Sequence, residues 1–455
     1  MVQNDEKTYG LSKARLESLF DSGTFVEIGA YTKRADAKNE FESVVCGYGA
    51  VEGKLAFAFI QDSGRTRGAF GERHARKIAA LYSLATKNGA PVIGVFDSAG
   101  AVVYDGAEAL AAYGRLMKNI SDASGVIPQI AVIDGVCGGA SSVAAAMFDL
   151  TVTVKDRAKL FVNPPFVVGA AEPASALGLS AYEAEDEAGA FAFVRELIST
   201  LPQNNADCAM TETADDASRA VAVDGADYQV TELVTTLADD GRSIRLFENY
   251  TDKAFLGFAS FGGVVSGVIA SNPATKGILD IKLARAASKL VSFCDSFGLP
   301  VVTLVDSEGL EVSAEAENAA YASELARLAY AYTSSENAKL TVVIGKAYGT
   351  AFTLLGSKSV GADMALALPT ASVSVLSPEA SVAFVWNDKV GEKSREEVEA
   401  EWKETCASAA SAVDSGEIDD IVMPSELRAR ICSALNMLVA KAEGAPSRRH
   451  PNLPL

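Results

Sequence analysis

Histidine is scarce in this 455-residue sequence, which contains only His74 and His450. Most hydrolase triads use histidine as the general base, and many zinc sites use it as a ligand, so the count excludes most of these mechanisms. Cysteine is scattered, with no CxxC pair, at Cys46, Cys137, Cys208, Cys294, Cys406 and Cys432. This spacing indicates neither a zinc ribbon nor a disulfide framework. We therefore expect no bound metal, and reduced thiols in a cytoplasmic protein.

Basic residues and long apolar runs are also in short supply. The sequence has 40 Lys and Arg against 59 Asp and Glu, a net charge of −19. Binding to nucleic acid through phosphate contacts is therefore disfavoured as a main role. No run reaches the length of about 18 apolar residues that predicts a transmembrane helix. The first twenty residues are polar and mixed in charge, unlike a secretory signal peptide.

The sequence does contain a long internal repeat. PVIGVFDSAG (91–100) and PVVTLVDSEG (300–309) share Pro, Val, Asp, Ser and Gly at matching positions, 209 residues apart. An amphipathic helical pattern precedes each copy, at 74–90 and at 283–299. Further downstream, VIDGVCGGAS (132–141) matches the later segment that starts at Val343, at an offset of 211. Small changes of offset are what loop insertions produce, so the pattern indicates a duplicated domain.

Each copy alternates short apolar strands with helices. The strands predicted at 92–96 and 301–305 are apolar throughout, as buried parallel strands are. This alternation predicts an α/β architecture with right-handed crossovers. The polar, acidic stretch 202–242 separates the copies, and we place the boundary at 225. The predicted domains are therefore 1–225 and 226–455.

A glycine-rich turn is the segment of the sequence that most clearly predicts a catalytic site. A predicted strand (130–134) leads into a turn at 135–139, and a helix of very small residues follows at 140–147. Gly138 and Gly139 lack Cβ, so a ligand atom could approach their N–H groups closely and be stabilised as an oxyanion. The turn lacks the GxxxxGK[ST] and GxGxxG patterns. A tight turn that needs glycine only for a positive φ explains the segment equally well.

Several segments together resemble a known family. They are GAPVIGVFDSAGA (89–101), VIDGVCGGASSVAAAMFDLTVTV (132–154), ILDIKLARAASKLVSFCDSFGLPVVTLVD (278–306) and GKAYGTAF (345–352). In this order they resemble the carboxyltransferase subunit of biotin-dependent acyl-CoA carboxylases and decarboxylases, within the crotonase superfamily. The likeness extends from residue 11 to the C-terminal residues.

The resemblance implies two tandem crotonase-like domains that arose by duplication. It implies acyl-CoA in the N-terminal domain and biotin, on a separate carrier protein, in the C-terminal domain of a partner subunit. The expected partners are a biotin carboxyl carrier protein and either a biotin carboxylase subunit or membrane decarboxylase subunits. A homodimer to hexamer is expected, in the cytoplasm or peripheral to a membrane complex.

The resemblance also assigns residues. The oxyanion hole for the thioester maps to Gly138 and Gly139, and the hole for the biotin ureido oxygen maps to Gly349, Thr350 and Ala351. The residues expected to line the CoA site are Gly68, Ala69, Phe70, Gly71, Ala99, Gly100 and Ala101. Arg65 and Arg67 are weaker candidates for contacts to CoA phosphates, and His74 is interpreted as structural.

The sequence departs from the family pattern at several of these places. Ala99 and Thr350 each replace a glycine, and the segment 307–317 carries Glu308, Glu311, Glu315 and Glu317. We interpret these glutamates as a solvated loop or helix start rather than a metal site. Two alternatives to a carboxyltransferase stay open. One is a crotonase-type acyl-CoA hydratase or isomerase, which would need a well-placed pair of glutamates. The other is a non-catalytic scaffold subunit of a carboxylase complex.

Overall fold

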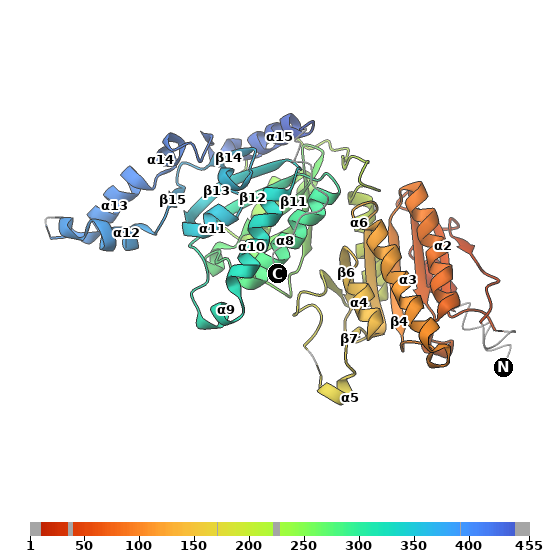
Figure 1. The fold of residues 1–455 in the computed structure, drawn as a ribbon. Coiled ribbons are helices and arrows are strands. Elements are labelled where there is room, and N and C mark those ends of the chain that lie inside the picture. The colour runs from red at the N-terminus through yellow and green to blue at the C-terminus, as the bar shows by residue number, and fades with distance from the viewer. Residues whose placement is uncertain (1–10, 35–39, 171, 222–227, 392, 442–455) are drawn as a thin grey trace. The chain divides into compact units, whose positions relative to one another are not determined.

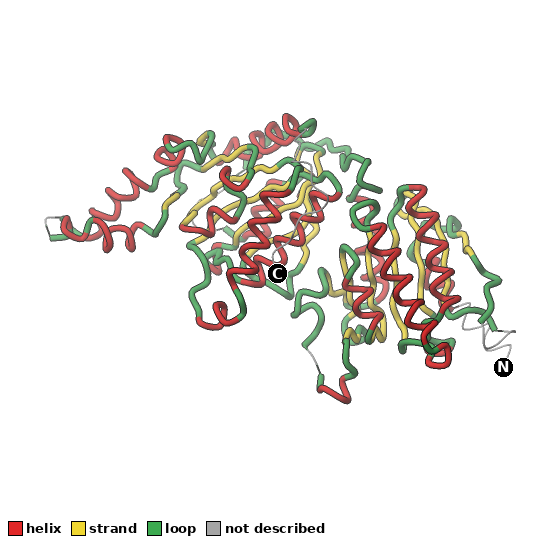
Figure 2. Tube along the Cα trace, in the orientation of Figure 1, coloured by secondary structure: helices red, strands yellow, loops and turns green. Residues whose placement is uncertain are grey.

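The computed structural model describes residues 11–34, 40–170, 172–221, 228–391 and 393–441. The chain divides into two compact units, Met1–Asp207 and Cys208–Leu455. Figures 1 and 2 show that each unit is a layered α/β structure, with helices packed on a sheet. Among the described helices, none combines the length and the apolar character needed to cross a membrane.

The N-terminal unit is built on an eight-stranded sheet. Its strands are β1 (Val26–Ile28), β2 (Val44–Val51), β3 (Lys54–Gln61), β4 (Val92–Ser98), β5 (Gln129–Gly138), β6 (Leu150–Val154), β7 (Lys159–Phe161) and β8 (Tyr182–Ala184). Its helices are η1 (Thr66–Gly68), α2 (Glu72–Asn88), η2 (Val103–Asp105), α3 (Ala107–Ala123), α4 (Ala140–Ala146), α5 (Pro165–Val168) and α6 (Glu187–Thr200).

The order of strands in this sheet is β1-β2-β3-β4-β5-β6-β8, with β7 paired to the end of β5. The first three strands are antiparallel, and β3 to β8 are joined by parallel pairings. Helices α2, α3 and α4 cover one face, as Figure 1 shows. The core between them buries side chains such as Phe59, Phe96, Ile133, Leu81 and Leu116. Parallel strands with helical crossovers place the carboxyl ends of β4 and β5 side by side.

The C-terminal unit repeats this plan. Its strands are β9 (Ser243–Leu246), β10 (Ala254–Phe261), β11 (Val264–Ser271), β12 (Val301–Ser307), β13 (Lys339–Tyr348), β14 (Met364–Ala367), β15 (Ser372–Ser374) and β16 (Asp420–Ile421). Its helices are α7 (Val230–Leu237), η3 (Asp239–Gly241), η4 (Pro273–Thr275), α8 (Ile281–Ser296), α9 (Ala314–Asn318), α10 (Tyr321–Ser334), α11 (Gly349–Leu354), η5 (Lys358–Val360), α12 (Pro378–Val385), η6 (Asn387–Lys389), α13 (Arg395–Cys406), α14 (Ala409–Asp414), η7 (Pro424–Glu426) and α15 (Leu427–Leu438).

The second sheet has the order β9-β10-β11-β12-β13-β14-β16, with β15 paired to β13, which matches the first sheet strand for strand. The register matches as well. Val92 pairs with Gln129 across β4 and β5, and Val301 pairs with Lys339 across β12 and β13. The duplication predicted from the sequence is thus visible in the hydrogen-bonded pairing of both sheets.

The structure confirms the predicted helices and strands and extends one of them. The helical patterns at 74–90 and 283–299 correspond to α2 and α8, and the predicted strand pair corresponds to β4 and β12. The expected turn at 135–139 is wrong, because β5 continues through Gly138. The short strand β7 pairs with residues 136–138 and so keeps them extended. Only Gly139 is left to make the turn into α4.

The division between the units lies earlier in the chain than the boundary that we placed at 225, a residue outside the described ranges. Residues 209–211 already pair with the start of β11. The N–H of Thr211 donates to the carbonyl of Gly263 (2.8 Å), and the N–H of Val265 donates to the carbonyl of Ala209 (3.1 Å). The acidic connecting stretch therefore begins as part of the second unit.

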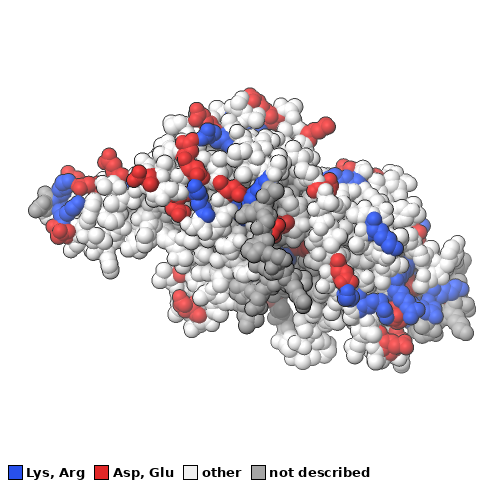
Figure 3. All heavy atoms as spheres, turned by 45° about the horizontal axis from the view of Figure 1, so that its top comes forward, with Lys and Arg blue, Asp and Glu red and all other residues white. Residues whose placement is uncertain are grey.

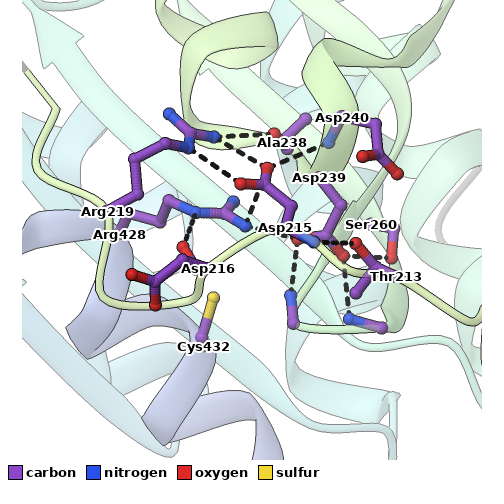
Figure 4. Close-up of polar contacts among 12 residues, drawn as sticks. Thr213, Asp215, Asp216, Arg219, Ala238, Asp239, Asp240, Ser260, Arg428 and Cys432 are labelled. Atoms are coloured by element: carbon purple, nitrogen blue, oxygen red, sulfur yellow. Dashed lines mark hydrogen bonds and ion pairs between the residues drawn. The ribbon is translucent and has the colours of Figure 1, made fainter.

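A buried arginine also attaches the connecting stretch to the rest of the second unit (Figure 4). Arg428 on α15 is fully buried and contacts the carboxylates of Asp239 (2.6 Å) and Asp215 (3.2 Å). It also donates to the carbonyls of Leu237 and Asp216. Burial opposes ionisation of Asp239, but the Gly263 N–H and Arg428 hold its pKa below the usual range. One guanidinium thus ties the connecting stretch, α7 and α15 together.

We predict that Arg428→Met destabilises the C-terminal unit by about 3 kcal/mol, because removal of its guanidinium leaves the buried Asp239 carboxylate without its charged partner. The control is Arg430→Met on the same helix. Arg430 is half exposed and pairs with exposed Asp420, so its loss should change the free energy of unfolding by less than about 1 kcal/mol. Urea denaturation of both variants measures the difference. Equal effects would contradict the central role of Arg428.

Candidate active site

The carboxyl ends of β4 and β12 carry the same aspartate and use it in the same way. Oδ1 of Asp97 accepts a hydrogen bond from the N–H of Val136 (3.1 Å), and Oδ1 of Asp306 accepts one from the N–H of Lys346 (2.8 Å). A Cβ at Gly135 would overlap the Asp97 carboxylate, and one at Gly345 would lie 2.5 Å from that of Asp306. Each strand end therefore depends on an aspartate packed against a glycine.

This pairing corrects the sequence alignment by one residue. The offset of 211 placed Gly138 and Gly139 opposite Gly349 and Thr350. The contacts instead make Gly135 equivalent to Gly345, an offset of 210, so that Gly139 corresponds to Gly349. Their φ angles agree, at +59° and +61°. The left-handed region strongly favours glycine, which explains why these two positions keep it.

The structure brings together the seven residues predicted to line the CoA site. The N–H of Phe70 donates to the carbonyl of Gly100 (2.8 Å), and Phe70 also bridges to Ala101. The N–H of Ala99 donates to the carbonyl of Arg67 (2.8 Å). Gly68, at φ +65°, packs so closely on Asp97 that a Cβ would overlap its carbonyl. The loop 68–71 and the turn 99–101 therefore form one unit at the end of β4.

The second copy contains the same loop, which the sequence comparison missed. Gly277 packs on the carbonyl of Asp306 as Gly68 packs on that of Asp97. The N–H of Leu279 donates to Gly309 (3.0 Å), as Phe70 does to Gly100. The equal spacing of each glycine from its aspartate, 68 to 97 and 277 to 306, was the signal available in the sequence.

Some predicted residues have packing roles in this structure. The Phe70 side chain is fully buried and stacks on Tyr113, with ring centroids 4.4 Å apart. Arg65 is also buried and pairs with Asp62 (3.5 Å), whereas Arg67 is exposed. His74 is fully buried, and burial lowers its pKa to about 3, so the structural interpretation of this residue is confirmed.

The Gly138–Gly139 turn is anchored on both sides. The N–H of Gly139 donates to the carbonyl of Phe161 (2.9 Å), and its own carbonyl accepts from the hydroxyl (2.7 Å) and N–H (3.1 Å) of Ser142. A Cβ at Gly138 would lie 2.6 Å from the Phe161 ring, whereas a Cβ at Gly139 would meet no atom within 4 Å. Gly139 therefore borders open space.

The corresponding turn in the second unit leads directly into α11. Gly349 is the first helical residue, and a Cβ there would lie 3.3 Å from the carbonyl oxygen of Val375. Thr350 is exposed and Ala351 is buried. The first N–H groups of a helix have no partner within it, so this segment presents backbone donors.

A mixed-charge cavity of about 280 Å³ adjoins the loop after β3. It is lined by Ala69 and Gly71 of the predicted CoA site. The cations that line it are Arg34, Arg73 and Arg76, and the acids are Glu42, Glu72, Asp105 and Glu108. Figure 3 shows basic side chains gathered on part of the N-terminal unit. Arg73 and Arg76 are not among the site residues predicted from the sequence.

Charged side chains surround Asp134, a buried residue of β5. Oδ2 of Asp134 contacts Arg15 (2.5 Å) and Arg157 (2.8 Å), and the Nε of Arg15 donates to Glu187 (2.8 Å). Burial and the adjacent Glu187 carboxylate raise the pKa of Asp134 to about 7. The Asp134 side chain is fully enclosed and that of Glu187 is partly exposed, so burial acts more strongly on Asp134. The signal in the sequence was an aspartate inside an apolar strand.

The glutamates at 308–317 form the predicted solvated loop and helix start. Ser313 caps α9, and Glu315 and Glu317 lie exposed in its first turn. Glu308 instead makes ion pairs with Lys346 (2.7 Å) and Lys276 (3.3 Å). Burial alone would raise the pKa of Glu308, but the two ammonium groups lower it. The helix start is confirmed for Glu315 and Glu317, whereas Glu308 belongs to a group of three ion-paired residues.

Two duplicated α/β units, each with a left-handed glycine after a parallel strand, define a protein of the crotonase type. The chain belongs to the carboxyl transferase domain family, whose sequence pattern matches residues 6–453. The family predicted from the sequence is thereby confirmed.

Relatives cover nearly the whole chain. The methylmalonyl-CoA decarboxylase subunit alpha of Veillonella parvula is 32% identical, over 98% of this chain and 93% of the relative. The propionyl-CoA carboxylase beta chain of Saccharopolyspora erythraea is also 32% identical, over 98% and 90%. The structure of transcarboxylase 12S with methylmalonyl-CoA and methylmalonic acid bound matches at a TM-score of 0.92 and 29% identity, over 100% of this chain and 95% of that one. The predicted fold is confirmed by this match.

The Asp134 cluster predicts a pH dependence of stability. A carboxyl with a raised pKa in the folded state binds a proton that the unfolded chain releases above pH of about 4. Its contribution to the free energy of unfolding is therefore fully present below about pH 4 and is lost as pH rises through about 7. Asp134→Asn should remove this slope. Urea titrations at pH 5 to 8 measure the difference between variant and unsubstituted protein, and a difference that stays constant would contradict the assignment.

Proposed function

We propose that this protein transfers a carboxyl group between carboxybiotin on a carrier protein and a short-chain acyl-CoA. The observation that carries the proposal is the pair of equivalent turns at Gly139 and Gly349, each placed by the same aspartate–glycine contact in a chain of the carboxyl transferase domain family. Two similar turns suit a reaction in which both the donor and the acceptor of the carboxyl group develop an oxyanion.

The acyl-CoA side is assigned to the N-terminal unit, within our boundary of 1–225. Gly138 and Gly139 would border the thioester oxygen. Because the N–H of Gly139 already donates to Phe161, we propose that Gly139 contributes its shape and open space. Hydrogen bonds to the oxyanion would then come from neighbouring backbone N–H groups, which stabilise negative charge without a titrating side chain. The joined loop 68–71 and turn 99–101 would hold the CoA.

The biotin side is assigned to the C-terminal unit, which contains the domain 226–455 predicted from the sequence. We propose that Gly349, Thr350 and Ala351 bind the ureido oxygen, because Gly349 keeps the start of α11 free of a Cβ, which would lie 3.3 Å from the carbonyl oxygen of Val375. Biotin, when bound, supplies the atom that carries the carboxyl group between sites. The protein's own contribution is to orient it and to provide backbone donors.

The protein would work with other polypeptides. A biotin carboxyl carrier protein would deliver the biotin, and a biotin carboxylase or membrane decarboxylase subunits would complete the cycle. Assembly as a homodimer to hexamer is proposed on the likeness to transcarboxylase 12S, which is described as a hexamer. The six free cysteines fit the cytoplasm, where thiols stay reduced.

The alternatives find less support. A hydratase or isomerase needs accessible carboxylates beside the acyl group. Asp134 on β5 is enclosed and contacts two arginines, and Glu187 on α6 contacts one of them, Arg15. A non-catalytic scaffold would have no need to keep both glycine turns, and the two turns agree within a few degrees of φ.

The direct test incubates the purified protein with malonyl-CoA or methylmalonyl-CoA and free biotin. Loss of the CoA-bound carboxyl group that depends on biotin is expected. No turnover of either ester, together with no measurable CoA binding, would overturn the proposal.

A single substitution tests the acyl side. Gly139→Val should lower kcat by about a hundredfold, because its side chain enters the open space beside the turn. The matched control is Gly53→Val in the hairpin between β2 and β3, which also has a positive φ and no neighbour within 4 Å. Both should lose about 1–2 kcal/mol of stability from backbone strain. Activity retained by Gly139→Val would show that the acyl site lies elsewhere.

A further inference from the structure

Two parts of the predicted acyl-CoA site, the loop 68–71 and the helix start that follows the Gly138–Gly139 turn, contact one side chain, Tyr113. This tyrosine lies on α3, next to α4 in Figure 1, and it is 5% exposed. We infer that Tyr113 is a positioning residue that holds the acyl oxyanion turn in register with the CoA-binding loop. The expected effect of Tyr113 on turnover rests on the proposed function. Its role in holding the turn does not.

The ring of Tyr113 fixes the loop. It stacks on Phe70 with centroids 4.4 Å apart and an angle of 23° between the rings. Phe70 in turn holds the turn 99–101 through its backbone, because its N–H donates to Gly100 and its carbonyl accepts from Val102 (2.9 Å). On its other side, Phe70 contacts the ring of buried His74 at 4.7 Å. The loop and the turn therefore share one packed aromatic support.

The hydroxyl of Tyr113 fixes the oxyanion turn. It shares a hydrogen bond of 3.0 Å with the hydroxyl of Ser141, and both groups are buried. Ser141 follows Gly139 by two residues. The turn itself is held by two contacts of Gly139, whose N–H donates to the Phe161 carbonyl and whose carbonyl accepts from Ser142. Of the side-chain contacts described around this turn, the bond to Tyr113 is the one that reaches α3 and, through its ring, the CoA loop.

The second unit uses a tyrosine differently. Tyr321, the first residue of α10, donates to the carbonyl of Leu279 and accepts from the N–H of Glu311 (3.1 Å). It thus supports the loop equivalent to 68–71, and its described hydrogen bonds do not extend to α11. The link from loop to oxyanion turn is therefore a property of the first unit, where the acyl-CoA is assigned.

Tyr113→Phe keeps the ring and removes only the hydroxyl, and Tyr82→Phe is its matched control. Tyr82 is also a buried tyrosine of this unit, and its hydroxyl donates to Gln129 (2.9 Å) at the opposite end of β5. Loss of either hydroxyl leaves one buried polar partner unsatisfied, so the two variants should lose similar stability. Only Tyr113→Phe should affect the turn.

The first measurement is hydrogen–deuterium exchange of the backbone amides of residues 136–143. Tyr113→Phe should speed exchange there about fivefold, and Tyr82→Phe should leave it unchanged. Ser141→Ala should reproduce the effect, and the double variant should exceed neither single one, since both remove the same bond. The second measurement is turnover. Tyr113→Phe should lower kcat about tenfold with KM for the CoA ester unchanged within twofold.

Two outcomes overturn the inference. One is exchange at 136–143 that is the same in Tyr113→Phe and Tyr82→Phe. The other is an equal loss of kcat in the two variants. If the unsubstituted protein turns over no CoA ester, the proposed function fails, while the exchange comparison still decides whether Tyr113 holds the turn.

Discussion

The contact between a strand-end aspartate and a glycine on the next strand is the constraint on which both units depend. In each sheet the ladder shifts register at this point, between Phe96 and Ser98 and between Val305 and Ser307. The aspartate lies at this irregularity and its carboxylate accepts a hydrogen bond from the N–H that the shift would leave unpaired. A buried backbone N–H needs such a partner. Everything beyond it, from the left-handed glycine to the small helix that follows, takes its position from this strand end.

Around this shared backbone the two copies have diverged in their side chains. The positions held by Arg67, Ala99 and Val136 in the first unit carry Lys276, Glu308 and Lys346 in the second, where Glu308 makes an ion pair with each lysine. Conversely, Asp134 has no charged counterpart, since Ile344 occupies that place in β13 and packs in the apolar core. The duplication preserved what the backbone geometry needs and let each unit acquire its own electrostatics, which is consistent with two different ligands.

Much of this could be read from the sequence because it depends on local patterns. Apolar strands, amphipathic helices and the recurring Asp-Ser-x-Gly predicted β4, β12, α2 and α8, and the quoted motifs led to the family. The predictions from the sequence were wrong where pairing between distant segments decides the local structure. The continuation of β5 to Gly138 depends on β7, and the correct offset of 210 depends on which glycine faces Asp306. The burial of Phe70 and Arg65 also required knowledge of neighbours distant in the sequence.

The sequence by itself determined the class of this protein: a duplicated α/β chain with glycines where the backbone must turn, because such requirements are written in residue type and spacing. Tertiary structure alone decided which groups those glycines face. It showed that the N–H of Gly139 is already bonded to Phe161, that Asp134 shares its carboxylate with two arginines, and that Tyr113 joins the loop to the turn. Side chains far apart in the chain meet only when the sheet and its helices have packed, so no local pattern could reveal them.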